Sequence, residues 1–142
     1  MDTGLVRKKV VEALQALRAQ QQQRRGRNAD AERDFATFLD LVATPLAKQV
    51  AGALKPEGYA LTVFTPGRGL RIALDKGRDD FVDLLLDTEG DRPQVVGRLS
   101  YTRGSRTVVE DMPVSEGTGP EGLTDEVVLE FLLRALAPLL SR

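Results

Sequence analysis

YALTVFTPGRGLRIALD, residues 59–75, consists of two short runs on either side of a turn. Apolar residues recur at every second position of both runs, and they are Tyr59, Leu61, Val63, Leu70, Ile72 and Leu74. A period of two brings alternate side chains to one face of a β-strand. The Pro66-Gly67 pair between the runs is typical of a tight turn. The stretch therefore predicts an antiparallel hairpin with one buried face.

Three further strands are expected downstream of this hairpin. Two of them have inward-facing residues at Val82, Leu84, Leu86, Val95, Leu99 and Tyr101, and the last is expected near 107–112. Gly97 falls within the second of these runs and indicates a bulge. One buried face is expected to carry inward residues from four of the strands, namely Leu61, Ile72, Leu84 and Leu99.

Short loops join the expected strands, at residues 65–68, 76–79, 88–93 and 103–106. Parallel neighbours would need long crossover connections, whereas antiparallel neighbours need only short turns. We therefore expect a five-stranded antiparallel β-meander over residues 59–114.

Residues before the meander have a helical period. Near the N-terminus, apolar residues recur every three to four positions, at Val6, Val10, Ala13 or Leu14, and Leu17. Gly26 is a typical helix stop, and Asn28 or Asp30 can cap a new helix. We therefore expect a basic helix over 1–27 and a helical region over 28–54.

The first of these helices needs a partner, because an isolated amphipathic helix of this length is marginal in water. We expect it to pack on the helices of its own domain and to contribute to a dimer interface. The second region contains Thr44-Pro45, a pair typical of a helix that restarts or kinks at this point.

A strongly apolar helix is expected after the meander, over residues 124–141. Thr124 is a typical N-cap, and Asp125 and Glu126 suit the positive end of the helix dipole. Together the elements predict an α+β fold in a single domain over 1–142. It would consist of N-terminal helices, the five-stranded antiparallel meander and a C-terminal helix packed on the apolar face of the sheet.

The composition is that of a globular protein, with 42% hydrophobic and 29% charged residues among 142. No apolar run reaches the ~20 residues that span a bilayer. The first twenty residues are charged throughout and lack the apolar segment of a secretory signal. No membrane partner is expected, and the cytoplasm is the expected compartment.

Histidine and cysteine are both absent from the chain. Their absence excludes Ser–His and Cys–His nucleophilic pairs and the common zinc sites. The spacing of Asp79, Asp80 and Asp83 resembles the DDxxD motif of helical prenyl-transfer enzymes, but here it leads into a strand that separates the carboxylates. We expect no metal, no cofactor and no catalytic residues, and an enzyme that uses carboxylates and Mg²⁺ is the third alternative for function.

Charge is distributed unevenly along the chain. Residues 1–27 carry seven basic and two acidic groups, or +5, while the other 115 residues carry thirteen basic and nineteen acidic groups, or −6. A basic arm of this kind can bind nucleic acid, through Arg7, Lys8, Lys9, Arg24, Arg25 and Arg27. The favoured interpretation places the last three at a solvated corner, because helix C-termini favour arginine.

Two loops of the expected meander carry further cations, at Lys76, Arg78, Arg103 and Arg106. In a meander the second and fourth connections lie at the same end of the sheet, about 10 Å apart. These four residues are therefore a candidate anion-binding site.

The expected function is that of a non-enzymatic binding or adaptor protein that acts through protein–protein contacts as a homodimer. The sequence does not identify the protein partner. The second alternative is a nucleic-acid or phosphate-binding module that uses the basic N-terminal helix and the loop cations.

Overall fold

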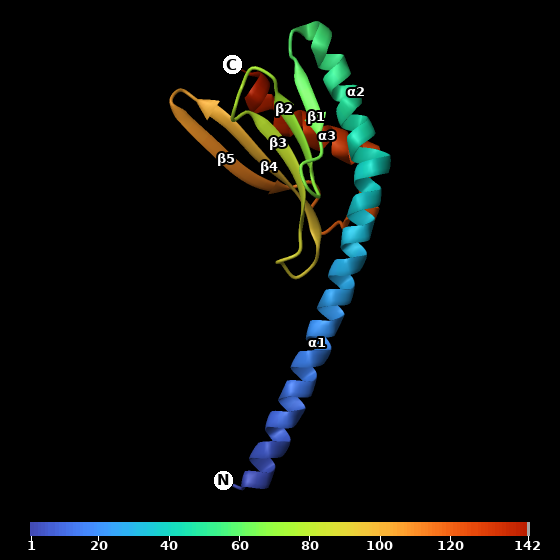
Figure 1. Cartoon of the computed structure of the whole chain (residues 1–142), viewed down its shortest axis with the longest axis vertical. Helices are drawn as coiled ribbons and strands as arrows, with labels where there is room; N and C mark the ends of the chain where they lie inside the picture. The colour runs from blue at the N-terminus through green and yellow to red at the C-terminus, as the bar shows by residue number, and fades with distance from the viewer. Residues whose placement is uncertain (142) are drawn as a thin grey trace.

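The computed structural model describes residues 1–141 and has the α+β architecture expected from the sequence (Figure 1). The helices are α1 (Thr3–Phe38), α2 (Thr44–Leu54) and α3 (Asp125–Leu140). The strands are β1 (Leu61–Phe64), β2 (Leu70–Leu74), β3 (Phe81–Asp87), β4 (Gln94–Arg103) and β5 (Arg106–Pro113). A π-helical segment, Leu39–Ala43, joins α1 to α2, and two 3₁₀ turns lie at Lys55–Glu57 and Pro120–Gly122.

The five strands form one antiparallel sheet in the order β1-β2-β3-β4-β5, which confirms the meander. The register places Ile72 beside Val82 and Val82 beside Leu99, so these residues form one row across the sheet. The predicted buried face is confirmed: Ile72, Leu84 and Leu99 are buried, and Leu61 packs against the same core.

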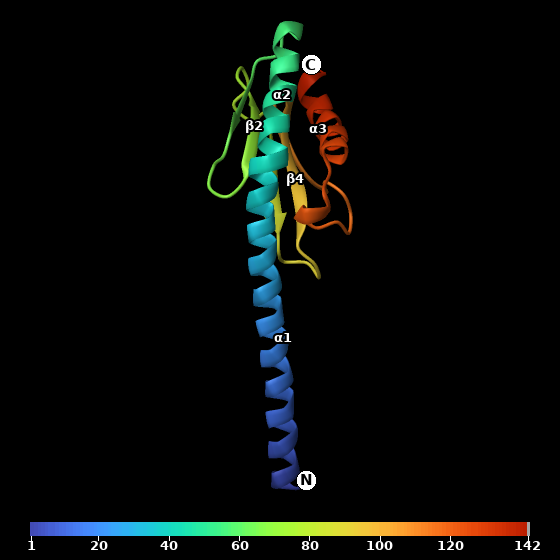
Figure 2. The same cartoon turned by 90° about the vertical axis from the view of Figure 1, so that its right-hand side faces the viewer.

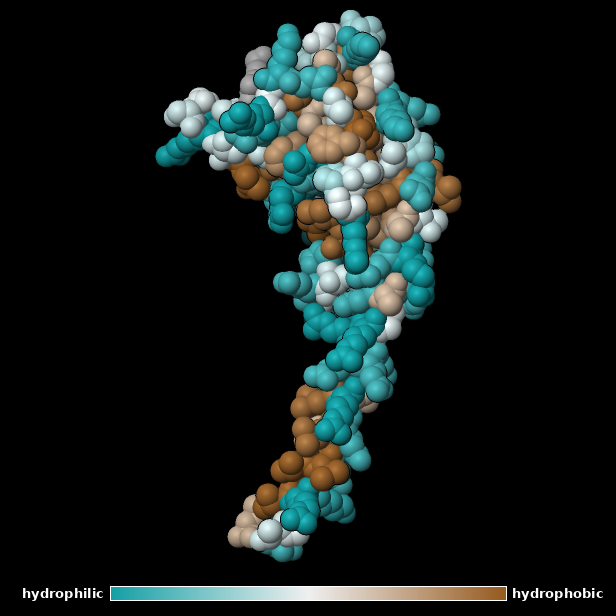
Figure 3. Space-filling model, viewed as in Figure 1, coloured by the Kyte–Doolittle hydropathy of each residue, from teal (hydrophilic) through white to brown (hydrophobic). Residues whose placement is uncertain are grey.

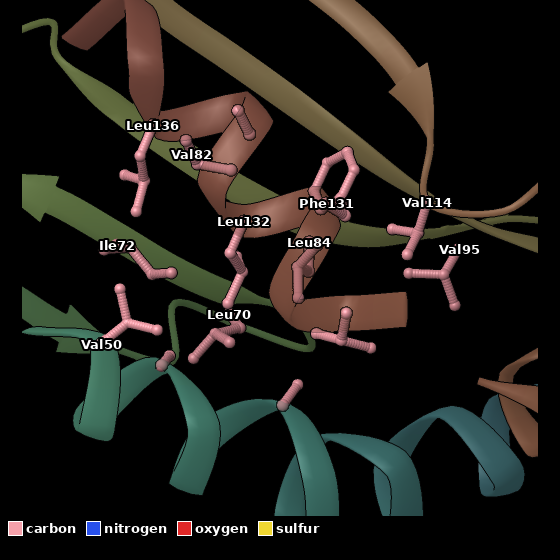
Figure 4. Close-up of a cluster of buried hydrophobic side chains, with 14 of the residues drawn as sticks. Val50, Leu70, Ile72, Val82, Leu84, Val95, Val114, Phe131, Leu132 and Leu136 are labelled. Atoms are coloured by element: carbon pink, nitrogen blue, oxygen red, sulfur yellow. The ribbon is translucent and has the colours of Figure 1, made fainter. Parts of the chain in front are cut away.

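Helix α3 lies across this apolar face and contacts β3, β4 and α2 (Figures 1 and 2). Phe131 and Leu132 of α3 are fully buried against the strands (Figure 4). The bulge expected at Gly97 is absent, since the register runs unbroken through this residue on both sides of β4. A Cβ at Gly97 would lie only 2.1 Å from Cζ of Phe131. The absence of a side chain at Gly97 therefore leaves the space that the Phe131 ring occupies.

The helix break expected at Gly26 is also absent, because α1 is one continuous helix of 36 residues. Gly26 does not adopt a positive φ, and so makes no left-handed stop. A single glycine costs a helix only about 1 kcal/mol relative to alanine, too little to end it here. The expected end of the first helix at residue 27 is therefore wrong.

The chain stays helical through Thr44-Pro45 but bends near this pair, where a restart or a kink was expected (Figure 1). Thr44 has helical dihedral angles, and its N–H donates to the carbonyl of Leu39, five residues earlier. Proline lacks an N–H and its ring clashes with a regular helix, and a π-helical segment is a common local adjustment. As a result α1 and α2 run past the sheet as one continuous but bent rod (Figures 1 and 2).

Replacing Gly26 by alanine should strengthen this rod. No atom lies within 4 Å of a Cβ built at Gly26, so the methyl group fits without displacing a neighbour. The gain in helix propensity is about 0.5–1 kcal/mol, and we expect slower amide hydrogen exchange in residues 5–22, by up to about fivefold. Gly52→Ala, in α2 and also without neighbours, is the matched control and should leave exchange in residues 5–22 unchanged. Faster exchange in the Gly26→Ala variant would contradict a helix that is continuous at this position.

Candidate functional site

The N-terminal half of α1 projects away from the rest of the molecule as a free rod (Figures 1 and 2). We call residues 1–23 the arm and residues 24–141 the body. Every residue from Met1 to Arg27 is exposed, and the first buried residue of the helix is Ala31. The expectation that this helix packs on its own domain is therefore wrong, because no element of the described chain covers the arm.

The arm meets the body at Arg24. Its guanidinium donates hydrogen bonds to the carbonyl oxygens of Thr88 and Glu89, at 3.4 and 3.2 Å, in the loop between β3 and β4. Beyond this point α1 contacts the 3₁₀ turn Pro120–Gly122 and buries Ala31, Phe35 and Phe38. Arg24 thus marks the end of the free part of the helix.

Apolar side chains gather on one side of the arm, where Figure 3 shows a brown patch. We define the arm stripe as Val6, Val10, Ala13, Leu14 and Leu17, all of them exposed. Successive residues of an α-helix are rotated by 100°, so the five residues fall within an arc of about 100° around Leu17. Leu5 and Val11 are similarly exposed, but each lies about 120° from Leu17, on the other faces of the helix.

The arm stripe points in the same direction as the side of α1 that is buried against the body. Phe35 follows Leu17 by 18 positions, which is five turns of 3.6 residues. The patch accordingly lies on the side of the arm toward which the sheet extends from the helix (Figures 1 and 3). The body covers this face from Ala31 onward, and the described chain leaves it open from Val6 to Leu17.

The basic residues of the N-terminal region surround the arm stripe and do not form one face. By the rotation of 100° per residue, Arg7, Arg18 and Arg25 lie on one flank, Lys9 and Arg27 on the other, and Lys8 on the opposite side. Arg24 points toward the body and is bound to backbone carbonyls. The predicted corner at Arg24, Arg25 and Arg27 is wrong, because these residues lie in the interior of a helix.

The two cationic loops lie at the same end of the sheet, as the topology predicts. The N–H of Thr102 donates to Oδ1 of Asp80 at 2.9 Å, and Oγ of Ser100 donates to the carbonyl of Asp79 at 2.6 Å. These two bonds attach the β2–β3 loop to β4. The loop cations Lys76, Arg78, Arg103 and Arg106 are all exposed. The guanidinium of Arg103 lies 5.5 Å from the centre of the Tyr101 ring. An anion site at these residues stays a prediction.

The three carboxylates of the DDxxD stretch have separate surroundings. Asp79 is exposed, Asp80 is buried and accepts the Thr102 N–H, and Asp83 is held by the guanidinium of Arg71 at 2.7 and 2.8 Å. Among the described residues, no cluster of three or more acidic side chains is placed to hold a metal ion.

The open face of the sheet carries a row of paired side chains that the sequence did not reveal. Neighbouring strands place Phe64, Arg71, Asp83, Arg98 and Asp111 side by side in one row. Arg71 also covers the Phe81 ring at 3.9 Å. Arg98 donates two hydrogen bonds to Asp111, which lower the pKa of that carboxyl below its ordinary value. The cations of this row are neutralised by neighbouring carboxylates, so the row offers little net charge to a ligand.

A cleft of about 940 Å³ lies between α1, the β1–β2 loop and the end of β3. Glu32 and Asp40 of the helix side and Arg68 of the loop contribute charges to its lining, and Glu32 and Arg68 form an exposed ion pair at 3.7 Å. Arg33 also lines the cleft and is paired with Asp30.

Comparisons of the chain with models of protein families, with curated proteins and with solved structures found no match. Within residues 1–141, no helix has both the length and the apolar character needed to cross a bilayer. The arm stripe is the feature of the described surface that most clearly lacks a structural explanation within the chain itself.

Proposed function

We propose that the protein is a non-enzymatic binding protein that acts through protein–protein contacts, as a homodimer, with the arm stripe as its docking surface. The observation that carries this proposal is the exposure of Val6, Val10, Leu14 and Leu17, which ranges from 41% to 54%. Contiguous exposed apolar patches on a folded protein mark interaction sites. The cytoplasm is the proposed compartment.

The spacing of the arm stripe supports a helical mode of binding. Anchors at intervals of three and four residues allow one amphipathic helix to pack against another apolar helix or into a groove. Isolated helices shorter than about 12–15 residues are marginal in water, and most helical stability in proteins comes from the packing of an amphipathic face. A protein partner would therefore stabilise the arm and cover its apolar side chains at the same time.

The body supports the proposal by fixing the direction of the arm. Phe35 and Phe38 anchor α1 in the core, and Arg24 ties the base of the arm to the β3–β4 loop. A docking helix that is fixed at one end loses less conformational freedom on binding than a free peptide would.

Nucleic-acid binding is the second candidate, because Arg7, Arg18 and Arg25 are exposed on one flank of the helix. Phosphate contacts of this kind need no aromatic residues, and they give an affinity that falls steeply with salt. It ranks second because the remaining cations lie on other faces and Arg24 is bound to the body.

A pair of leucine variants tests the docking surface. Leu17→Glu places a carboxylate in the arm stripe, whereas Leu5→Glu makes the same change at a similarly exposed leucine outside it. In sedimentation equilibrium, we expect Leu17→Glu to weaken self-association about 100-fold or more, because each dimer loses two apolar contacts and gains two buried charges. Leu5→Glu should change it by less than about threefold. At a concentration where all three proteins are monomeric, both variants should unfold at the same temperature as the native chain.

Equal effects of the two substitutions would contradict the proposal. A titration of labelled DNA and RNA at two salt concentrations separates the second candidate. Tight binding at physiological salt by a monomer, weakened by Arg18→Gln and unaffected by Leu17→Glu, would establish the nucleic-acid alternative in its place.

A further inference from the structure

We propose that the arm stripe is covered by the arm stripe of a second copy, which runs antiparallel about a two-fold axis between Val11 and Glu12. This inference rests on the proposed function, because it names the partner of the same surface. Three observations carry it: the spacing of the stripe, the length of the free arm and the position of the body.

Four of the five arm-stripe residues are level with one another when one copy is reversed, and the fifth, Leu14, is level with Lys9 of the partner. About an axis between residues 11 and 12, residue x of one copy is level with residue 23 − x of its partner. Val6 is then level with the partner's Leu17, and Val10 with the partner's Ala13. The same residues occupy alternating a and d positions of a heptad, so each layer of the pair joins an a to a d position. Both layers contain only apolar side chains.

The length of the free arm matches this arrangement. Met1 of the partner is level with Gln22, since 23 − 1 is 22, and Gln22 lies just before Arg24. Arg24 is the residue at which the helix meets the β3–β4 loop. Residues 1–22 of each arm can therefore pair without overlapping the body of the other copy.

The position of the body argues against a parallel pair. The arm stripe and the buried side of α1 point in the same direction, because Leu17 and Phe35 are five turns apart. In a parallel pair in register, the second helix would lie on the stripe side and would run into the body from Ala31 onward. An antiparallel pair has its two bodies at opposite ends.

Charge favours the same orientation. In a parallel pair in register, every cation of the arm is level with the same cation of the partner, and this arrangement of like charges is unfavourable. In the antiparallel pair Arg7, Lys8 and Lys9 are level with residues 14–16 of the partner. These are Leu14, Gln15 and Ala16, none of them charged.

Cysteine cross-linking tests the orientation, and the chain suits this method because it contains no cysteine of its own. Val6→Cys and Leu17→Cys are prepared as separate full-length proteins. After mild oxidation, we expect a disulfide-linked dimer from their mixture and less than about one tenth of that yield from either protein alone. In the antiparallel pair, identical positions are 11 residues apart along the axis, about 16 Å, too far for a disulfide.

The matched control uses Leu5→Cys mixed with Arg18→Cys. These positions are also level, since 5 and 18 sum to 23, but both lie outside the stripe, and their mixture should not cross-link. Efficient cross-linking of Val6→Cys alone would establish a parallel pair and overturn the inference. Absence of any cross-link would also overturn it.

The two proposals fail in different ways. If Leu17→Glu weakens self-association and the mixture of cysteine variants does not cross-link, the stripe binds a second copy in another geometry. If the full chain is a monomer and Leu17→Glu changes nothing, the homodimer and the antiparallel pair are both wrong.

Discussion

Replacing Phe131 by alanine should lower the free energy of unfolding by about 3–5 kcal/mol, the range for large aromatic truncations in a packed core. Phe131 is fully buried, and its ring lies against the backbone of β4 at Gly97. The change removes a large apolar side chain and leaves a cavity between α3 and the sheet. Chemical denaturation of the native and variant proteins measures the loss.

Leu133→Ala is the control for this change, because Leu133 belongs to the same helix and is 54% exposed. We expect it to cost less than about 1 kcal/mol. Gly97→Ala should destabilise the native chain, since its Cβ would meet the Phe131 ring, and should be tolerated when residue 131 is alanine. Independent, additive effects of the two substitutions would show that the glycine and the ring do not pack together.

Replacing Leu84 by alanine should cost about 2–5 kcal/mol. Leu84 is 1% exposed on β3, the central strand, and it is paired with Gly97 of β4 and with Leu70 of β2. Leu85→Ala is the control, because this neighbour on the same strand points to the other face and is only partly buried. Chemical denaturation should show a smaller loss for Leu85→Ala, and a loss below about half a kcal/mol for Leu84→Ala would mean that the strand faces the other way.

The sheet was predictable because its signals are local. Strands of alternating residues separated by Gly and Pro turns leave few arrangements open, and short loops select antiparallel neighbours. The inward phase of Ile72, Leu84 and Leu99 follows from the same period of two. The capping of α3 was also predictable, and the hydroxyl of Thr124 does accept the Val127 N–H.

The continuity of α1 was missed because Gly26 and Asn28 were given the weight of a helix stop. Glycine permits a stop but does not require one, and its cost within a helix is small. A signal for continuity was present in the sequence. Leu17 and Phe35 are a whole number of turns apart, so one helical face runs through the glycine.

The paired row on the open face could not be derived from composition alone. Arg71, Asp83, Arg98 and Asp111 become neighbours only once the register of three strand pairs is known. The uncovered state of the arm is a similar case. An amphipathic helix predicts that a partner exists, but its sequence alone does not say whether that partner belongs to the same chain.

Small-angle X-ray scattering of the full-length chain tests the central claim most directly, because one measurement reports both mass and shape. The partner's Arg24 is level with position 23 − 24, or −1, so the two Arg24 residues are 25 positions apart, about 38 Å along the pair. We predict the mass of two 15.5 kDa chains. We also predict a pair-distance distribution with two maxima, one from distances within a body and one from distances between the two bodies. The mass of one chain at all concentrations, or two chains with a single compact maximum, would contradict the account.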